Sequence, residues 1–293
     1  MTAKHKARII INPISGGREK KDIPGLLQQY LDQTKFEAEF CFTKSAEHAK
    51  ELSKEAVILK RDLVIAAGGD GTLNLAAAGL INSGIPMGII PLGSGNGFAR
   101  ALNIPMNTIA AIKNINTGKA IAIDSGLANQ VSFINVCGFG FDAHVSSKFA
   151  EAGTRGLKTY ARISLKELNQ YKSKTYEIEI DNSTQKQTAF ILAICNGPQY
   201  GNNAFIAPLA EFSDGLFDIS ILEEVTWKNI IPLGLNLFLK KLYQSKNAKH
   251  KRAANITVEQ DSAAYVNIDG EPIWFEKKVN IQLLPKSLQI IVP

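Results

Sequence analysis

The sequence predicts a two-domain protein in which a doubly wound, Rossmann-like α/β domain precedes a β-rich, sandwich-like domain. Three observations predict this fold class. Apolar runs typical of strands alternate with helical patterns over the first 124 residues, and such alternation favours a parallel sheet covered by helices. Glycine-rich loops follow three of those apolar runs. After residue 124 the pattern changes to short strands separated by turns, with helical interruptions near residues 155–171 and 227–243.

The first two predicted strands lie before residue 43. Residues 8–12 form a strand-like run with apolar Ile9, Ile10 and Ile11, which leads directly into Pro13-Ile14-Ser15-Gly16-Gly17. Phe36–Phe42 form the second run, which is followed by Thr43 and by a helix from about Ser45. Taken alone, Thr43 is an ordinary strand-end or helix-capping threonine.

The most informative loop is Gly68-Gly69-Asp70-Gly71-Thr72, between a predicted strand at residues 63–67 and a helical pattern at 73–78. Glycines let backbone N–H groups approach an anion, and the N-terminus of the following helix adds a positive dipole. Asp70 would repel a bare phosphate, so its position predicts a cation between the two.

A third glycine loop, Gly93-Ser94-Gly95-Asn96-Gly97, follows the strand pattern of residues 87–92 and leads into a helical pattern at 98–102. A single loop of this kind is most often a tight strand-to-helix turn. The carboxyl ends of strands in an open parallel sheet line one crevice, however. The three loops are therefore expected to face a single ligand.

The change of pattern divides the chain into an α/β domain at residues 1–124 and a β-rich domain at residues 125–293. One alternative is that the last strand, at about residues 287–293, returns to the first domain. The crevice between the domains is the expected site.

Composition sets further limits. The 293 residues are 45% hydrophobic and 20% charged, as in ordinary globular domains. No apolar run is long enough to span a bilayer, and the basic start of the chain has no apolar signal core, so a cytoplasmic location is expected. Cys41, Cys137 and Cys195 are expected to be reduced core residues, and the four histidines show no metal-ligand spacing with them.

The net charge of +6 is unevenly distributed. No carboxylate occurs between Glu224 and Glu259, while the same segment holds Lys228, Lys240, Lys241, Lys246, Lys249, Lys251 and Arg252. An apolar stretch at 227–243 runs into this basic segment. Peripheral contact with an anionic membrane surface is one interpretation; a helix packed on the sandwich and followed by a solvated basic tail is the other. Nucleic acid is not an expected partner, because only Tyr243 is interleaved with the basic cluster.

Several motifs together make the chain similar to the diacylglycerol kinase catalytic-domain family, which includes sphingosine and ceramide kinases and small bacterial lipid kinases. They occur in family order across nearly the whole chain. The motifs are Asn12-Pro13 with Gly16-Gly17, the loop from Gly68 to Thr72 with Asn74, Pro91-Leu92-Gly93-Ser94-Gly95-Asn96 with Phe98-Ala99-Arg100, Gly138-Phe139-Gly140-Phe141-Asp142, Asp214-Gly215-Leu216-Phe217-Asp218, and Asp269-Gly270-Glu271.

This resemblance implies a kinase that transfers the γ-phosphoryl group of ATP to a lipid hydroxyl with Mg²⁺, in phospholipid biosynthesis or related lipid metabolism. It places Mg²⁺ beside Asp70. It implies nucleotide contacts at Asn12, Pro13, Ile14, Ser15, Gly16, Thr43, Gly68, Gly69, Asp70, Gly71, Thr72, Leu73, Asn74 and Gly95. Phosphoryl transfer needs positioning and charge neutralisation of this kind.

The resemblance also assigns residues of the second domain. A carboxylate of the Asp269-Gly270-Glu271 segment is implied to be the catalytic base, although Asp-Gly between strands is by itself usually a hairpin turn. Glu211, Asp214 and the carbonyl of Leu216 match a structural Mg²⁺ site, which a bare turn would also explain.

The lipid itself stays open between diacylglycerol-like and sphingoid-like substrates. Gly97 stands where many diacylglycerol-type members have aspartate, and Asp142 matches a headgroup position of sphingosine kinases. An enzyme of the NAD kinase type shares the Gly-Gly-Asp-Gly-Thr loop, but the Asn-Glu pair expected for its ribose is missing. A non-catalytic nucleotide or lipid sensor is the other alternative. The oligomeric state is open, an oligomer included.

Overall fold

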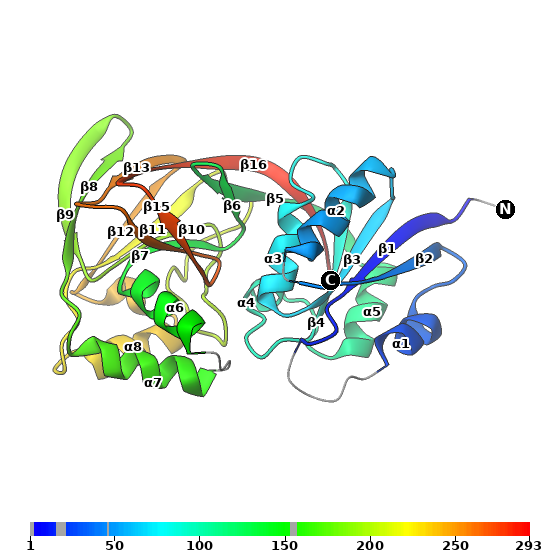
Figure 1. The fold of residues 1–293 in the computed structure, drawn as a ribbon, viewed down its shortest axis with the longest axis horizontal. Helices are drawn as coiled ribbons and strands as arrows, with labels where there is room; N and C mark the ends of the chain where they lie inside the picture. The colour runs from blue at the N-terminus through cyan, green and yellow to red at the C-terminus, as the bar shows by residue number, and fades with distance from the viewer. Residues whose placement is uncertain (1–2, 16–21, 46, 153–156) are drawn as a thin grey trace. The chain divides into compact units, whose positions relative to one another are not determined.

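The computed structural model describes residues 3–15, 22–45, 47–152 and 157–293 (Figure 1). The chain divides into two compact units: unit 1 comprises residues 1–123 and 286–293, and unit 2 comprises residues 124–285. The chain thus passes between the units twice, within β5 (Lys119–Ala128) and within β16 (Lys278–Val292).

Unit 1 contains a parallel sheet with the strand order β2-β1-β3-β4-β16. Its strands are fully or largely apolar, as is typical of a sheet covered on both faces. The elements are β1 (His5–Ile11), α1 (Ile23–Tyr30), β2 (Phe36–Phe42), α2 (His48–Ile58), β3 (Leu63–Gly68), α3 (Asp70–Ala78), β4 (Pro86–Pro91), α4 (Gly97–Ala101) and α5 (Thr108–Thr117).

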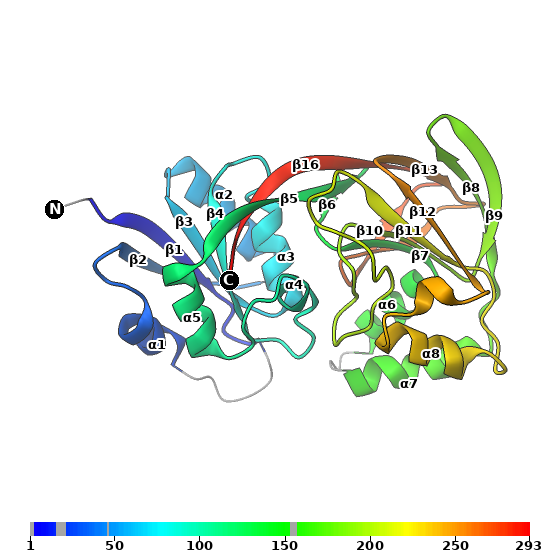
Figure 2. The same cartoon turned by 180° about the vertical axis from the view of Figure 1, so that it is seen from behind.

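Helices cover both faces of this sheet: α2 and α3 lie on one face, and α1 and α5 lie on the other (Figures 1 and 2). Alternate residues of β1 show why. Ile9 and Ile11 belong to the apolar cluster that includes side chains of α1 and α5. Arg8 points the other way, is buried, and donates to the Leu52 carbonyl oxygen and to Glu55 of α2. A second carboxylate, Glu39, completes the pairing of this buried charge.

Unit 2 contains two facing layers of strands. One is an antiparallel sheet with the order β12-β11-β10-β7-β14-β15, and the other follows the order β16-β13-β8-β9. The strands are β6 (Val131–Phe133), β7 (Val136–Gly140), β8 (Lys174–Ile180), β9 (Ser183–Ala189), β10 (Ile191–Cys195), β11 (Phe217–Leu222), β12 (Ala248–Ala253), β13 (Asn255–Glu259), β14 (Ala264–Ile268) and β15 (Glu271–Phe275). One buried cluster takes Phe139 and Phe217 from the first layer and Tyr176 and Val258 from the second. The predicted fold class is confirmed.

Unit 2 also carries α6 (Phe141–Glu151), α7 (Leu157–Leu168), α8 (Ile230–Phe238) and the short 3₁₀ helix η1 (Leu242–Gln244). Helix α6 was not expected, and residues 131–136, whose sequence has the pattern of one strand, break between β6 and β7 at Ile134 and Asn135. The break has a clear cause, because the N–H groups of Ile134, Asn135 and Val136 donate to the Asp269 carboxylate. No helix in the described part of the chain is long and apolar enough to cross a membrane.

The three cysteines have free thiols. Cys137 is buried between the two layers of strands, and Cys195 is buried in a second apolar cluster on the other face of its sheet. Burial raises the pKa of both thiols well above the ordinary value. Cys41 is only half-buried.

The end of β16 is expected to stabilise unit 1, since Gln289 and Ile290 pair with Pro86 and Met87 of β4 and Ile290 is fully buried. Ile290→Ala should lower the free energy of unfolding of unit 1 by about 2–5 kcal/mol, as measured by chemical denaturation. Gln289→Ala, on the neighbouring residue, is the control and should cost less than about 1 kcal/mol. Equal effects of the two changes would contradict this role.

Candidate functional site

Three loops of unit 1 lie at the same edge of its sheet. β1, β3 and β4 are neighbours and run parallel, so the segments that follow Ile11, Gly68 and Pro91 leave the sheet side by side. Parallel strand ends of this kind are the usual place for a ligand in an α/β fold.

Direct hydrogen bonds join the first loop to the second. Asn12 Nδ2 donates to Thr72 Oγ1 over 2.7 Å, and Gly69 N donates to Ser15 Oγ over 2.7 Å. Asn12 Oδ1 also accepts from Ile14 N within its own loop. The side chains of Asn12 and Ser15 therefore hold the loops together.

The second and third loops approach each other closely at glycines. A Cβ atom on Gly93 would lie 2.7 Å from Gly69 Cα and 2.8 Å from Asn96 Oδ1. Asn96 adopts a positive φ of 49° and ties its loop together, because its side chain accepts from Gly93 N and donates to the Gly93 carbonyl oxygen. Larger residues at Gly93 would push the two loops apart.

Asp70 connects the second and third loops through its carboxylate. It is the first residue of α3, and its Oδ1 accepts from Phe98 N over 3.3 Å. Burial raises the pKa of Asp70, and the backbone N–H groups of Phe98, Asn96 and Gly97 act against that rise. The charged form of Asp70 is thus favoured by the N–H donors around it, and a cation nearby would favour it further.

The other predicted nucleotide residues lie around the same edge. Thr43, at the end of β2, is buried, and its N–H donates to the Ile11 carbonyl oxygen. Ile14 is 84% exposed. Asn74, one turn after Asp70 on α3, is buried, and its Oδ1 has no hydrogen-bond partner among the described residues. Gly95 accepts from Arg100 Nε through its carbonyl oxygen, and Gly16 lies outside the described residues.

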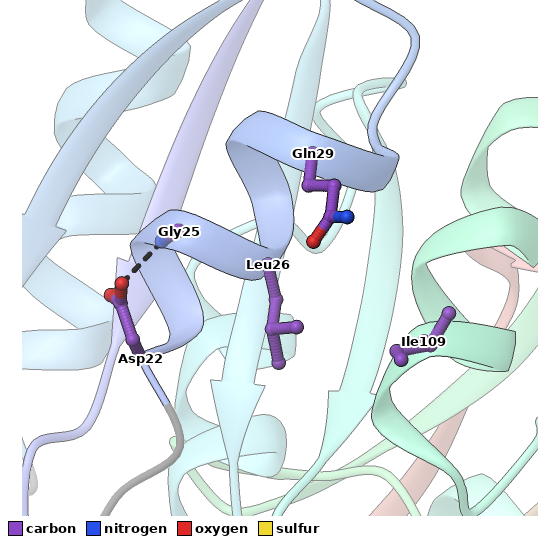
Figure 3. A pocket seen from close by; sticks show the side chains of 5 residues that line it. All are labelled: Asp22, Gly25, Leu26, Gln29 and Ile109. Carbon is purple, nitrogen blue, oxygen red and sulfur yellow. Dashed lines mark hydrogen bonds between the residues drawn. The ribbon is translucent and has the colours of Figure 1, made fainter.

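A separate open pocket of about 530 Å³ lies between α1 and α5 (Figure 3). Asp22, Gly25, Leu26, Gln29 and Ile109 line it, and Asp22 caps α1 by accepting from Gly25 N. None of the sequence-predicted site residues lines this pocket.

In unit 2 the predicted turn joins β14 to β15. Asp269 and Gly270 both have positive φ, 53° and 98°, as a two-residue hairpin turn requires. The Asp269 carboxylate accepts from three backbone N–H groups, those of Ile134 at 2.7 Å, Asn135 at 2.8 Å and Val136 at 2.9 Å. Glu271, the next residue after the turn, is exposed. The two predicted base candidates therefore have different environments.

Asp142 lies in the first turn of α6 and is only 3% exposed. Its Oδ1 accepts from Asn267 Nδ2 over 2.9 Å, while its Oδ2 has no hydrogen-bond partner among the described residues. Burial raises the pKa of Asp142 to about 6, and the Asn267 amide and the nearby Tyr200 hydroxyl act against that rise. Asn267 was missed by the sequence analysis, since a single asparagine within a strand pattern carries no signal of its own.

The predicted structural metal site lies beside an arginine. Arg252 contacts the carboxylates of both Asp214 and Asp218. Burial raises the pKa of Asp218, Arg252 lowers it, and the nearby Asp214 and Glu211 raise it further. The oxygen donors suit a hard cation, but the described residues contain no group of three His, Cys, Asp or Glu side chains arranged to hold a metal. The site at Glu211, Asp214 and Leu216 stays a prediction.

Comparisons with known proteins agree across the whole chain. The diacylglycerol kinase catalytic domain matches residues 6–128, and the YegS C-terminal NAD kinase beta sandwich-like domain matches residues 135–292. A protein of Bacillus subtilis named diacylglycerol kinase is 31% identical over 91% of this chain and 89% of its own length. A Klebsiella pneumoniae protein named "Probable lipid kinase YegS-like" is 31% identical over 82% of this chain and 80% of its own. The crystal structure of a diacylglycerol kinase from Bacillus anthracis has a TM-score of 0.77 at 24% identity, and covers 100% of this chain and 98% of its own.

The buried Asp142 predicts a pH-dependent stability. Its pKa of about 6 exceeds the value near 4 of an unfolded chain, so the folded protein holds the proton more tightly between these values. The free energy of unfolding should fall as pH rises from about 4 to 6, by about 3 kcal/mol from this group. Asp142→Asn should abolish that fall. The free energy of unfolding of the variant minus that of the wild type should therefore increase by about 3 kcal/mol as pH rises from about 4 to 6. If denaturation experiments give a constant difference in the free energy of unfolding between variant and wild type from pH 4 to 8, the raised pKa of Asp142 is contradicted.

Proposed function

Because the chain belongs to the diacylglycerol kinase catalytic-domain family, we propose that it transfers the γ-phosphoryl group of ATP to a lipid hydroxyl with the help of Mg²⁺. The observation that carries this proposal is the set of three loops at the ends of β1, β3 and β4, held together by Asn12, Ser15 and Asp70. They bring the N-terminus of α3 to one edge, where the positive end of the helix dipole favours the phosphates of a bound triphosphate.

The nucleotide contacts belong to the segments 12–16 and 68–74, with Thr43 and Gly95 beside them. Mg²⁺ fits Asp70, whose partly buried carboxylate has a raised pKa, and Asn74, whose buried Oδ1 lacks a partner among the described residues. Mg²⁺ would supply charge neutralisation at the phosphate oxygens. The side chains of Asn12 and Ser15 act by fixing the loops.

We assign the base to Glu271. The Asp269 carboxylate already accepts from three backbone N–H groups, so both of its oxygens are engaged in holding the chain before β7. Glu271 is exposed and directly follows the turn formed by Asp269 and Gly270. In the proposed reaction, Glu271 takes the proton of the lipid hydroxyl while that oxygen bonds to the γ-phosphorus. The bond from phosphorus to the bridging oxygen breaks, ADP leaves, and Glu271 then releases the proton to water.

The lipid substrate is proposed at the level of a hydroxyl-bearing lipid, diacylglycerol-like or sphingoid-like. Asp142 Oδ2, which is buried and unpartnered among the described residues, is the proposed contact for a polar headgroup. Gly97, the first residue of α4, is buried and is the second candidate for contact with the lipid substrate.

The function is tested by γ-phosphoryl transfer from ATP to diacylglycerol, monoacylglycerol, sphingoid bases, ceramide and NAD, with vesicles present. Transfer to one of the lipids is expected, and transfer to NAD alone would establish the NAD kinase alternative. No transfer to any acceptor would favour the sensor alternative.

Asp70→Asn keeps the side-chain volume and an oxygen for Phe98 N, so it should fold normally and lose more than about nine-tenths of the rate.

Glu271→Gln and Asp269→Asn should fail in different ways. Glu271→Gln should lower kcat by roughly 10²–10⁴-fold with unchanged thermal stability. Asp269→Asn replaces one carboxylate oxygen by an NH₂ group, so at least one of the three N–H donors loses its acceptor. This change should destabilise the fold by about 1.5–3 kcal/mol, as measured by denaturation. Normal turnover by Glu271→Gln would remove Glu271 from the mechanism.

Membrane contact is proposed at α8 and the residues around it. Ile231, Leu235, Phe238 and Leu239 form one exposed stripe, each at least 55% exposed. Lys228, Lys241 and Lys246 are exposed and form no ion pair within the described residues. The predicted basic tail needs correction, because Ala248–Ala253 form strand β12, where Lys249 pairs with Glu223 and Arg252 with Asp214 and Asp218. The apolar stripe and the three lysines suit an anionic bilayer surface.

Lys228, Lys241 and Lys246 changed together to glutamate should weaken sedimentation with anionic vesicles and raise the apparent KM for vesicle-borne lipid. Each lysine near such a surface contributes about 1 kcal/mol. Activity on a short-chain soluble substrate should be spared. Lys54, Lys60 and Lys119, exposed in unit 1, changed to glutamate give the matched control for net charge. Equal losses in the two triple variants would refute docking through this surface.

A further inference from the structure

Asn267 uses both ends of its side-chain amide inside unit 2. Its Nδ2 donates to Asp142 Oδ1 over 2.9 Å, and its Oδ1 accepts from Gly270 N over 2.8 Å. The side chain is buried, with 4% of the residue exposed. One amide therefore joins the first turn of α6 to the turn that precedes Glu271.

The surroundings of Asn267 leave its amide one productive orientation. Gly138, its pairing partner on β7, makes room for Asp142, because a Cβ there would lie 1.8 Å from Asp142 Oδ2. The acceptor at Asp142 fixes which end of the amide carries the NH₂ group, so the oxygen must face Gly270 N. A flipped amide would place donors against the Gly270 N–H and lose both hydrogen bonds.

We propose that Asn267 is a positioning residue for the reaction, and that Asp142 acts through it to hold the turn that carries Glu271. This inference rests on the proposed function of Glu271 as the base. Positioning of this kind acts on rate, because a displacement of about 1 Å of a catalytic group can cost about 10²-fold. Asp142 thus has two uses for its two oxygens: Oδ1 orients Asn267, and Oδ2 remains for a headgroup.

The proposal can be tested by exchanging the two side chains. In Asn267→Asp alone, two carboxylates face each other and repel. In Asp142→Asn with Asn267→Asp, the new amide at 142 can donate to the carboxylate at 267, which still accepts from Gly270 N. We therefore expect Asn267→Asp to lower kcat by about 10²-fold in the wild-type background, and by less than about threefold in the Asp142→Asn background, with KM little changed by the 267 substitution in both.

The pH profile gives a readout that a purely structural role would not move. A proton shared between the two carboxylates of Asn267→Asp would restore the hydrogen bond, so its loss of kcat should grow from pH 6 to pH 9. Among the residues that the structure describes, the other titratable groups that interact electrostatically with Asp142 are Tyr160, Tyr200, Cys137 and Cys195, and the Tyr200 hydroxyl also favours the charged form of Asp142. Burial raises the pKa of each of them, so they stay neutral in this range. The double variant should not show this dependence.

Hydrogen exchange of the Gly270 amide, followed by NMR without substrate, separates this inference from the proposed function. Exchange should be about tenfold faster in Asn267→Ala, which loses one hydrogen bond, and should return to the wild-type rate in the exchanged double variant. Ser220→Ala is the matched control, because it loses a buried hydrogen bond to the Ile206 carbonyl oxygen in the same sheet without touching the turn. Its Gly270 exchange should be unchanged.

The outcomes are distinct. If the wild type transfers phosphate to no lipid, the proposed function fails, while Gly270 exchange still decides whether Asn267 holds the turn. Equal costs of Asn267→Asp in both backgrounds would overturn the coupling. Unchanged Gly270 exchange and kcat in Asn267→Ala would overturn the positioning role. If Asn267→Asp folds only together with Asp142→Asn, the rescue itself supports the pairing.

Discussion

The candidate nucleotide site depends on one constraint, the adjacency of β1, β3 and β4 in a parallel sheet. Adjacency brings their three loops together, and glycines at positions 69 and 93 let the last two touch. The polar side chains at this edge then serve the loops themselves, as the Asn12–Thr72 and Asp70–Phe98 bonds illustrate. A ligand would meet a surface whose shape is fixed before it arrives, which lowers the ordering cost of binding.

Unit 2 uses aspartate in two opposite ways. Asp269 accepts from three backbone N–H groups and so joins the chain before β7 to the turn. Asp142 has one amide donor and one oxygen without a partner in the described part of the chain, so its charge is poorly compensated. A charged Asp142 lowers the stability of the fold, because burying an incompletely paired charge costs free energy. Its presence therefore points to a purpose other than stability.

The fold class and the glycine loops could be predicted from the sequence, since alternating apolar patterns and glycine clusters are local features of the chain. Glu271 and Asp269 could not be separated from sequence, because the difference lies in N–H groups more than a hundred residues away at Ile134 to Val136. The basic segment was misjudged for a similar reason: Lys249 and Arg252 look solvated in the sequence, but long-range pairing places them beside Glu223 and Asp214. Asn267 belongs to the same class, as both of its partners are set by tertiary structure.

The return of β16 to unit 1 affects the order in which the protein is assembled. Gln289 and Ile290 pair with the edge of β4, and Ile291 belongs to the apolar cluster of unit 1, yet these residues are synthesised about two hundred residues after β4. Unit 2, by contrast, is contiguous in the chain. During synthesis, the β4 edge of unit 1 therefore lacks its β16 partner until Gln289 and Ile290 have emerged from the ribosome. Such an edge is prone to unwanted pairing with other chains, so chaperones would have most to protect during this interval.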